Sequence, residues 1–323
     1  MGNRALALAA LILTTAFSAT VQAQTNVIQY DSFQSPGGYT LADYEANWIN
    51  PFGLGEMHED YIGDTRTFEN GKLRIDAAPF QTSADFSVFD HIKYFAITPT
   101  PVAIPQEGSI TFSAEIEAET PGTVPGRIIE GTYVQSGQPY KSIALEGQQA
   151  CATLHMIDFA SGQLFDWLVS GNKALALTER LPTTVTGSPG AGRNEIYTQI
   201  VGEFEITPGA HNYAIRYSRD SDGDQVEFLI DGQVMASYEG VGVPLDNREE
   251  FVKYPALGNG ELLKDKMQFF TMAHGVFSLL DEFPFQHPDA PEFSVSIPVE
   301  NRIFGQGVRA TYDNFKITTS TKD

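Results

Sequence analysis

The chain has 323 residues and carries 41 acidic against 20 basic side chains, a formal net charge of −21 at pH 7. A surface this negative repels phosphate backbones and anionic membranes, which argues against a nucleic-acid partner. The single cysteine, Cys151, excludes an intramolecular disulfide, and its apolar neighbours indicate a small buried side chain rather than a nucleophile.

Residues 1–23 have the three-part pattern of a secretory signal peptide. Arg4 supplies the positive end, and an apolar segment follows at residues 5–17. This segment is shorter than the ~20 residues that cross a bilayer, and no later segment is both long and uncharged, so we expect no transmembrane anchor. Small residues at 21 and 23 predict cleavage after Ala23 and a mature protein that is periplasmic or secreted.

Glycine and proline recur along the chain and helical periodicity is scarce, a pattern typical of short strands joined by turns. Residues 109–118 alternate polar and apolar side chains, which predicts a strand with one buried face. Residues 150–181 predict a meander of three strands with turns at 160–162 and 171–172. Further strands are predicted at residues 211–217, 225–230, 234–238, 267–280 and 307–318. Such spacing favours a sandwich or barrel over an alternating α/β fold.

Several motifs resemble the concanavalin A-like superfamily, including its laminin-G-like members. They lie at residues 30–33, 69–75, 208–213, 226–234 and 310–317, with Trp48 after the first. In that superfamily the first strand usually pairs with the last. The resemblance implies one all-β jelly-roll sandwich of two antiparallel sheets over residues 24–323, with long rim loops and with Trp48 as a buried anchor.

The chain resembles more closely a bacterial family of unknown function within that superfamily. The segments that carry this resemblance are residues 89–93, 157–166, 179–181 and 304–309. Fold analogy alone suggests a protein that binds an oligo- or polysaccharide on its concave sheet. The alternatives are a carbohydrate-active enzyme, and a structural or adhesion module without a small ligand.

One enzymatic alternative is a hydrolase built on Glu115, Glu117 and Glu119, which share a strand face because they alternate. They resemble the acids of retaining glucanases in the superfamily, although those enzymes have an aspartate where Glu117 stands. A retaining pair needs carboxyl groups ~5–5.5 Å apart, whereas residues i and i+4 of a flat strand lie ~13 Å apart. Catalysis would therefore require a bend or bulge, and a solvated strand face is the simpler interpretation.

The other enzymatic alternative resembles the superfamily's lyases, which bring an Arg, a Gln or His, and a Tyr together on one concave face. Their local motif Q-[IV]-H is absent from this sequence. His91 and Lys93 are expected on one strand face, His155 on another strand, and Arg180 at a strand end. Such side chains could neutralise a carboxylate and move a proton. The competing interpretation is a structural histidine at 155 and surface charges at 93 and 180.

Two groups of aspartates are candidate ligands for a structural calcium ion. Asp220, Asp222 and Asp224 offer the oxygen ligands that calcium prefers, but the downstream glutamate of an EF-hand is missing. Turn geometry alone also explains aspartates at a hairpin tip. Asp31 and Asp313 form the second candidate, because relatives of the fold hold calcium between their first and last strands.

Sugar binding needs aromatic faces and a few polar groups on a concave surface. Most of the 22 phenylalanines are expected in the core. The candidate aromatic platforms are Tyr133, Tyr140, Trp167 and Tyr197.

Overall fold

The computed structural model describes residues 24–50, 65–82, 91–182, 186, 190–245, 256–281 and 291–322. The predicted signal peptide and its cleavage site after Ala23 lie at or beyond the edge of the described residues. None of the described helices is long and apolar enough to cross a membrane.

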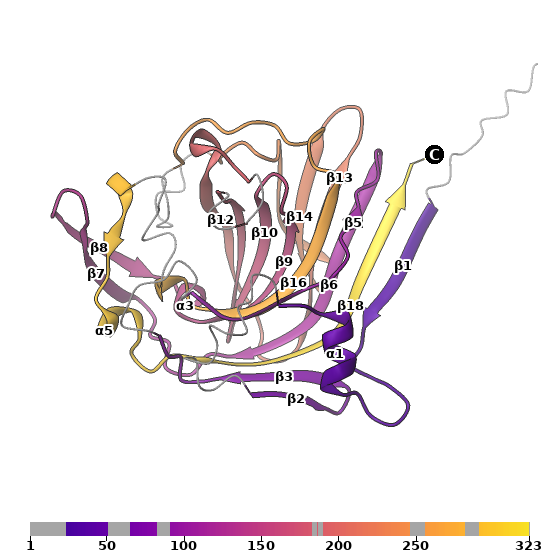
Figure 1. Ribbon diagram of the computed structural model, residues 1–323, viewed down its shortest axis with the longest axis horizontal. Coiled ribbons are helices and arrows are strands. Elements are labelled where there is room, and N and C mark those ends of the chain that lie inside the picture. The colour runs from indigo at the N-terminus through magenta and orange to yellow at the C-terminus, as the bar shows by residue number, and fades with distance from the viewer. Residues whose placement is uncertain are drawn as a thin grey trace, which may run out of the picture.

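The larger sheet, sheet A, joins the two ends of the described chain. Its strands are β1 (Gln24–Asp31), β2 (Thr65–Glu69), β3 (Lys72–Ala77), β6 (Gly108–Glu119), β13 (His211–Arg219), β14 (Asp224–Ile230), β15 (Gln233–Glu239) and β18 (Val308–Thr321). They lie in the order β15-β14-β13-β6-β18-β3-β2, and β1 also pairs with β18. Ile28 lies opposite Ile317, so the first and last strands are neighbours, as Figure 1 shows.

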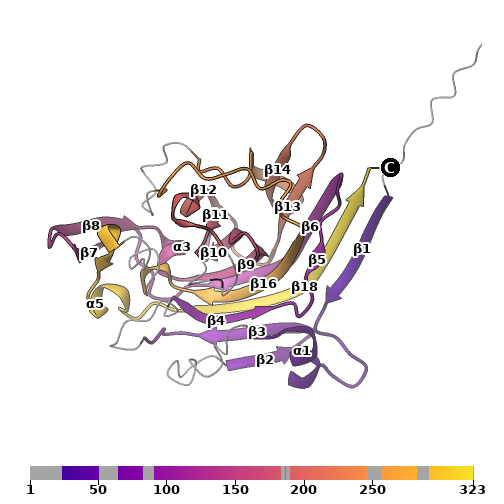
Figure 2. The ribbon, with the colours of Figure 1, turned by 45° about the horizontal axis from the view of Figure 1, so that its top comes forward.

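The second sheet, sheet B, packs against sheet A. Its strands are β4 (Ile92–Ile97), β5 (Val102–Ala103), β9 (Cys151–Asp158), β10 (Gln163–Ser170), β11 (Lys173–Arg180), β12 (Tyr197–Glu205) and β16 (Phe269–Phe277). Their order is β12-β11-β10-β9-β16-β4, with β5 on β16. Figure 2 shows β9 and β16 layered against β6 and β18. All pairings in both sheets are antiparallel.

A small third sheet and short helices complete the described fold. The third sheet contains β7 (Arg127–Tyr133), β8 (Pro139–Ala144) and β17 (Val295–Ser296), and its hairpin projects from one side in Figure 1. The helices are α1 (Leu41–Asn47), α3 (Glu146–Gln149) and α5 (Val299–Arg302), with single 3-10 turns η2 (Arg193–Glu195), η3 (Leu279–Asp281) and η4 (Pro291–Phe293).

The core between sheets A and B follows from strand alternation. In β6, Phe112, Ala114 and Ile116 are fully buried while the residues between them keep some exposure. This confirms the two-residue alternation predicted for 109–118. From sheet B, Trp167 enters the same core and donates from its indole nitrogen to the Ala214 carbonyl, 3.0 Å away. Trp48 is 2% exposed, as expected for an anchor.

Two tight hairpins have the turn residues that their geometry needs. Asp231 and Gly232, between β14 and β15, both have positive φ, at 50° and 80°. Asn70 and Gly71, between β2 and β3, have φ of 53° and 72°. Positive φ at both central residues defines the hairpin turn that matches strand twist, and Asn, Asp and Gly tolerate it best. The fold is thus the predicted all-β sandwich of two antiparallel sheets.

Candidate functional site

Sheet B has an outer face, which is the face turned away from sheet A. Leucines from neighbouring strands contribute to it, namely Leu164 and Leu168 on β10 and Leu175 and Leu177 on β11, together with isoleucines and phenylalanines of the other strands. These side chains belong to an apolar cluster separate from the main core. The outer face is therefore largely apolar, and the ionisable groups on it are surrounded by apolar side chains.

Three such ionisable groups form what we call the acid–histidine cluster: His155 on β9, Asp166 on β10 and Glu179 on β11. Each takes an alternation position between residues of the outer apolar cluster. His155 lies directly opposite Asp166 in the strand pairing. Glu179 is two residues beyond Leu177, which lies opposite Asp166. The register of three adjacent strands thus gathers the cluster.

The His155–Asp166 pair is buried and closely hydrogen-bonded. His155 is 4% and Asp166 1% exposed, and Nδ1 lies 2.6 Å from the Asp166 Oδ1. The Thr153 hydroxyl donates to the Gly275 carbonyl at 3.1 Å, so its oxygen accepts from His155 Nε2 at 2.6 Å. Because Nε2 carries a hydrogen, the proton between Nδ1 and the carboxyl group is shared within the pair.

Glu179 is the member of the cluster that retains partial exposure. It accepts a hydrogen bond from the Thr198 hydroxyl at 2.9 Å. Burial of its carboxyl group, together with the negative charge of Asp166, raises the pKa of Glu179 to about 8, against the opposing effect of the Thr198 hydrogen bond. Glu179 is therefore protonated at neutral pH and can act as a hydrogen-bond or proton donor.

Asp166 differs from Glu179 in its partner. Burial raises the pKa of Asp166, but the charge of His155 and the hydrogen bond from its ring oppose this shift. Phe95 and Phe277 pack against the His155 ring, with centroids 5.2 and 5.1 Å away. These aromatic walls keep water from His155 and strengthen its interaction with Asp166.

The structure does not gather the four residues of the lyase prediction. His91 and His155 both contact Phe277, which places them near one another. Lys93 instead donates to the Gln81 carbonyl at 3.0 Å. Arg180 follows Glu179 and so points away from the outer face, and its guanidinium binds Glu261 at 2.8 Å.

The glutamates of the hydrolase prediction lie on sheet A, away from the cluster. Glu115, Glu117 and Glu119 share the solvent-facing side of β6. The expected bend is not found, because β6 pairs with β18 in continuous register from Glu115 to Glu119. Flat alternation keeps the end carboxylates too far apart for a retaining pair, which corrects that prediction.

Two of the predicted aromatic platforms are buried inside the sandwich. Trp167 and Tyr197 have no exposed area, so neither ring can stack on a sugar. Tyr133 and Tyr140 belong to the third sheet, where they pack edge to face at 5.6 Å and keep partial exposure. Burial between the sheets therefore corrects the first two assignments.

The carboxylate of Asp31 is already satisfied by protein donors. Oδ1 accepts from the Phe33 amide at 2.9 Å, and Oδ2 accepts from the Tyr39 hydroxyl at 2.6 Å and the Trp48 indole at 2.9 Å. Asp313 accepts from the Asn314 amide at 2.6 Å. Within the described ranges, no group of three or more His, Cys, Asp or Glu side chains is arranged to hold a metal ion.

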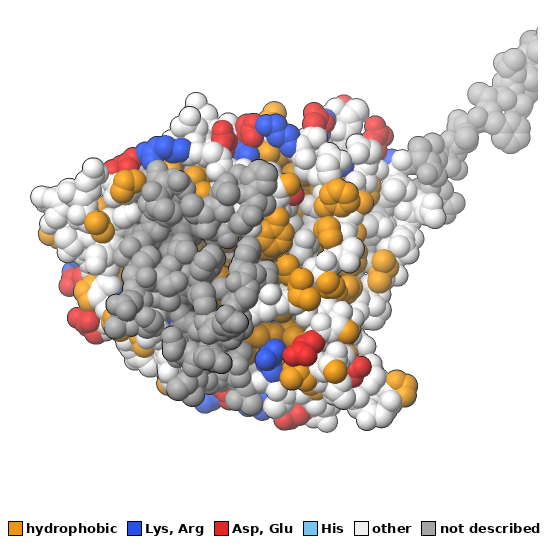
Figure 3. All heavy atoms as spheres, viewed as in Figure 1, with side chains coloured by type: hydrophobic (Ala, Val, Ile, Leu, Met, Phe, Trp, Pro, Cys, Tyr) orange, Lys and Arg blue, Asp and Glu red, His pale blue; other side chains and the backbone are white. Residues whose placement is uncertain are grey.

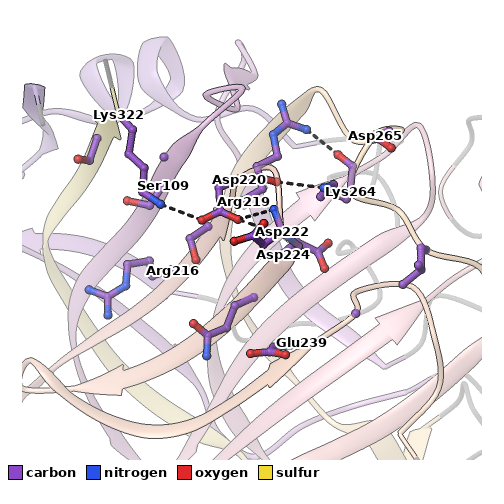
Figure 4. A pocket seen from close by; sticks show the side chains of 17 residues that line it. Ser109, Arg216, Arg219, Asp220, Asp222, Asp224, Glu239, Lys264, Asp265 and Lys322 are labelled. Atoms are coloured by element: carbon purple, nitrogen blue, oxygen red, sulfur yellow. Dashed lines mark hydrogen bonds and ion pairs between the residues drawn. The ribbon is translucent and has the colours of Figure 1, made fainter. Parts of the chain in front are cut away.

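The second aspartate group lines a surface pocket of about 940 Å³ at the end of sheet A, shown in Figure 4. Asp220 pairs with the Lys322 ammonium at 2.8 Å, and Lys264 binds the Asp220 carbonyl at 3.0 Å. Asp224 accepts from the Tyr217 hydroxyl at 3.1 Å and from the Val241 amide at 3.2 Å. Figure 3 shows acidic and basic side chains beside one another along the upper edge of the molecule in that view. Lys322 thus already pairs with one of the carboxylates that calcium would bind.

Asp166 and Glu179 were missed as site residues in the sequence. The available signal was a carboxylate inside an otherwise apolar strand, as in residues 164–169. A charged residue there is costly unless it is paired or functional. Cys151, by contrast, is buried as expected, and burial raises the pKa of its thiol.

Residues 67–321 match a protein-family model described as "Family of unknown function (DUF6081)". No curated protein matches the sequence. The chain is similar in structure to an endo-1,3-beta-glucanase from Streptomyces sioyaensis, at 12% identity and a TM-score of 0.44, over 96% of this chain and 100% of that one. It is also similar to beta-agarase B from Zobellia galactanivorans, at 10% identity and a TM-score of 0.45, over 93% and 95% of the two chains. At these levels the chemistry has to be argued from the residues of this chain.

Proposed function

We propose that this chain, which belongs to the DUF6081 family of unknown function, is an exported protein that binds a glycan on the outer face of sheet B. The observation that carries the proposal is the acid–histidine cluster, a small set of polar groups fixed in an apolar wall. Binding sites for small ligands combine apolar walls with a few oriented polar groups in this way. The jelly-roll fold supports the choice of a sugar only by analogy.

Hydrogen bonding at Glu179 is the expected basis of recognition. Its protonated carboxyl group can donate to a sugar oxygen while the Thr198 hydroxyl holds its other oxygen. Trp167 and Tyr197 are buried between the sheets, so stacking on those rings does not contribute. The proposal therefore assigns recognition to Glu179 and its neighbours rather than to an aromatic platform.

A panel of soluble polysaccharides, neutral and anionic, tests the binding role by affinity electrophoresis and calorimetry on the chain from Gln24 onward. We expect at least one glycan to bind, and Glu179→Ala to weaken its binding about 10-fold or more, since the loss of a hydrogen bond to a partly buried acid costs ~1–3 kcal/mol. Glu117→Ala, on the solvent face of sheet A, is the matched control. Absence of binding to every glycan, or equal binding by wild type and Glu179→Ala, would contradict the proposal.

Export rests on the pattern of residues 1–23 and has its own test. The full chain is expressed in a bacterial host, the periplasm and medium are separated from the cytoplasm, and the amino terminus is sequenced. We expect an exported protein that begins at Gln24. An uncleaved cytoplasmic chain would contradict export while leaving the glycan proposal standing.

A further inference from the structure

We infer that the pocket at the end of sheet A is a second carbohydrate site, which binds an extended, uncharged glycan on the face turned away from sheet B. This site goes beyond the proposed function, which places a glycan on sheet B, and it shares no residue with the acid–histidine cluster. Three features of the pocket support it: a row of polar side chains along its floor, walls held in place by hydrogen bonds, and a charge that disfavours anions.

The floor of the pocket is a row of four polar side chains on four neighbouring strands. Ser109 on β6 lies opposite Ser218 on β13 and, on its other side, opposite Ser320 on β18. Ser218 lies in turn opposite Gln225 on β14. Side chains of directly paired residues leave the same face of a sheet, and all four keep partial exposure. The row therefore faces the open pocket rather than the core.

The polar groups of this row are not used by the protein. Within the described part of the chain, no hydrogen bond involves any of these four side chains. A hydroxyl can both donate and accept a hydrogen bond, and an amide does the same through two atoms. Sugar hydroxyls have the same dual capacity, so a glycan can form a hydrogen bond with each member of the row.

The spacing of the row suits a chain of sugar units that lies across the strands. Neighbouring strands of a sheet are ~4.7–4.9 Å apart, so polar side chains recur at that step along the pocket floor. This step is close to the length of one pyranose unit in an extended chain. One sugar unit can therefore meet each of the four strands, β14, β13, β6 and β18.

The uncharged floor is confined to the end of sheet A that the pocket covers. Along the outer face of β6, Ser109 is followed by Thr111 and Ser113, and glutamates begin at Glu115. Of these residues only Ser109 lines the pocket. A glycan in the pocket thus avoids the carboxylates further along the same strand, and Ser113 provides a matched position outside the pocket.

Hydrogen bonds between loops hold the walls of the pocket in place. The Arg219 guanidinium donates to four backbone carbonyls, including those of Lys264 and Met267 at 2.7 and 2.8 Å. The Lys264 ammonium donates to the Asp220 carbonyl at 3.0 Å, which ties the segment before β16 to the turn between β13 and β14. A site that is formed before the ligand arrives loses less conformational entropy on binding.

The charges around the pocket favour an uncharged ligand, because its basic side chains already have partners. Arg216 pairs with Glu227 at 2.5 Å. Lys322 pairs with Asp220 at 2.8 Å, a contact drawn in Figure 4. In the described ranges, no ion pair involves three other acids of the lining, Asp222, Glu239 and Asp265. A sulfate or uronate would meet repulsion from these carboxylates, whereas a neutral sugar would not.

The rim of the pocket adds an exposed apolar side chain. Leu262 lines the pocket and is 64% exposed. Sugar rings carry C–H groups beside their hydroxyls, so this leucine can contact a ring while the floor binds its hydroxyls. The pocket therefore offers both kinds of group that a sugar site combines.

The first test measures binding of cello-, manno- and xylo-oligosaccharides, which are extended and uncharged, by calorimetry on the chain from Gln24 onward. For a series that binds, affinity should rise from the disaccharide and level off near the tetrasaccharide, because the row spans four strands. Ser109→Ala and Gln225→Ala should each weaken binding about 3–10-fold, and the double variant about 10–100-fold, since each change removes a hydrogen bond. Ser113→Ala, the matched control, should bind as wild type does.

The second test compares the oligosaccharide that binds with the same oligosaccharide after carboxymethylation, which adds negative charge. The carboxymethylated form should bind more weakly, and the difference should shrink as the salt concentration rises, because salt screens the repulsion from the carboxylates of the pocket. Asp222→Asn should also reduce the difference between the two forms.

Glu179→Ala separates this site from the proposed one on sheet B, because Glu179 does not line the pocket. In the Glu179→Ala background, the double change at Ser109 and Gln225 should still weaken binding. Equal binding with and without the double change would overturn the pocket site while leaving the proposed function standing. Tighter binding of the carboxymethylated form would overturn the choice of an uncharged ligand, and no binding of any of the three series would overturn the whole inference.

Discussion

Two sets of three ionisable side chains lie on strand faces of this molecule, in opposite environments. Glu115, Glu117 and Glu119 follow one another along the solvent face of β6 in sheet A. His155, Asp166 and Glu179 come from three different strands and meet on the outer face of sheet B, where their neighbours are leucines and phenylalanines. Charged residues at alternate positions of one strand are spread along a solvent-exposed face. Charged residues brought together by the register of neighbouring strands are instead surrounded by apolar side chains.

The largest expected difference between the two sets is in stability. Asp166→Ala leaves His155 buried without its partner, so we expect the free energy of unfolding to fall by about 3–5 kcal/mol. Glu115→Ala, on the solvent face, should change it by no more than about 0.5 kcal/mol. Urea titrations followed by fluorescence measure both values. A loss below about 1 kcal/mol for Asp166→Ala would contradict the described pairing.

The next effect is the pH dependence that Glu179 gives to stability. Its pKa in the folded protein is about 8, so between roughly pH 4 and 8 the folded state keeps a proton that the unfolded chain releases. This contribution is complete below the unfolded pKa and is lost as pH rises through about 8. We therefore expect the melting temperature of wild type to decline more than that of Glu179→Gln between pH 5 and 9.

Glu117→Gln is the control for this pH series and should follow wild type throughout. If the melting temperatures of wild type and Glu179→Gln changed with pH in parallel, Glu179 would be ionised at neutral pH. Its carboxyl group would then behave like those of the glutamates on the solvent face of β6.

A smaller effect of opposite sign should come from His274 in the core between the sheets. Burial lowers the pKa of His274 to about 3, and its ring packs against Trp48 at 4.6 Å. Below about pH 6.5 the His274 imidazole binds a proton in the unfolded chain but stays neutral in the folded protein. The free energy of unfolding therefore decreases as pH falls toward 3. In His274→Gln, unfolding measured from pH 7 to 4 should show a shallower acid slope, whatever the shift in absolute stability. If the slope of stability against pH were the same in His274→Gln and wild type, the His274 ring would not be neutral in the folded protein at these pH values.

The smallest expected effect is that of calcium on thermal stability. The carboxylates of Asp31 and Asp220 already accept several protein hydrogen bonds or bind a lysine. Metal binding would have to displace these partners, so adding calcium or a chelator should leave the melting temperature nearly unchanged. A rise in melting temperature that saturates with calcium would instead support the calcium site that the aspartate spacing suggested.

Much of the fold could be predicted because strand alternation and turn residues are local signals. The predicted meander at 150–181 corresponds to β9, β10 and β11, and the Asp231–Gly232 turn joins β14 to β15. β12, the β7–β8 hairpin and α1 were not predicted. The β7–β8 hairpin has exposed apolar residues on both strands, such as Ile128 and Ile143, so its polar and apolar positions do not alternate clearly.

The candidate site could be predicted only in part, because it depends on register between strands. His155 was identified, but nothing in the sequence shows that Asp166 lies opposite it or that Glu179 lies one diagonal step away. The glutamates of β6 stood out because they occupy alternate positions of one short segment, which is also why they are spread along one exposed face. Trp167 and Tyr197 were assigned to the wrong side of sheet B, since each strand has two faces and the sequence does not tell which one meets sheet A.

The most direct test of the account is a titration of the Glu179 side chain by carbon-13 NMR, with Glu179→Gln used to assign its carboxyl signal. The account predicts a midpoint near pH 8, and a change in that midpoint when the glycan identified by the panel is bound. A midpoint near that of an ordinary glutamate, about 4.3, with no response to the glycan would contradict it.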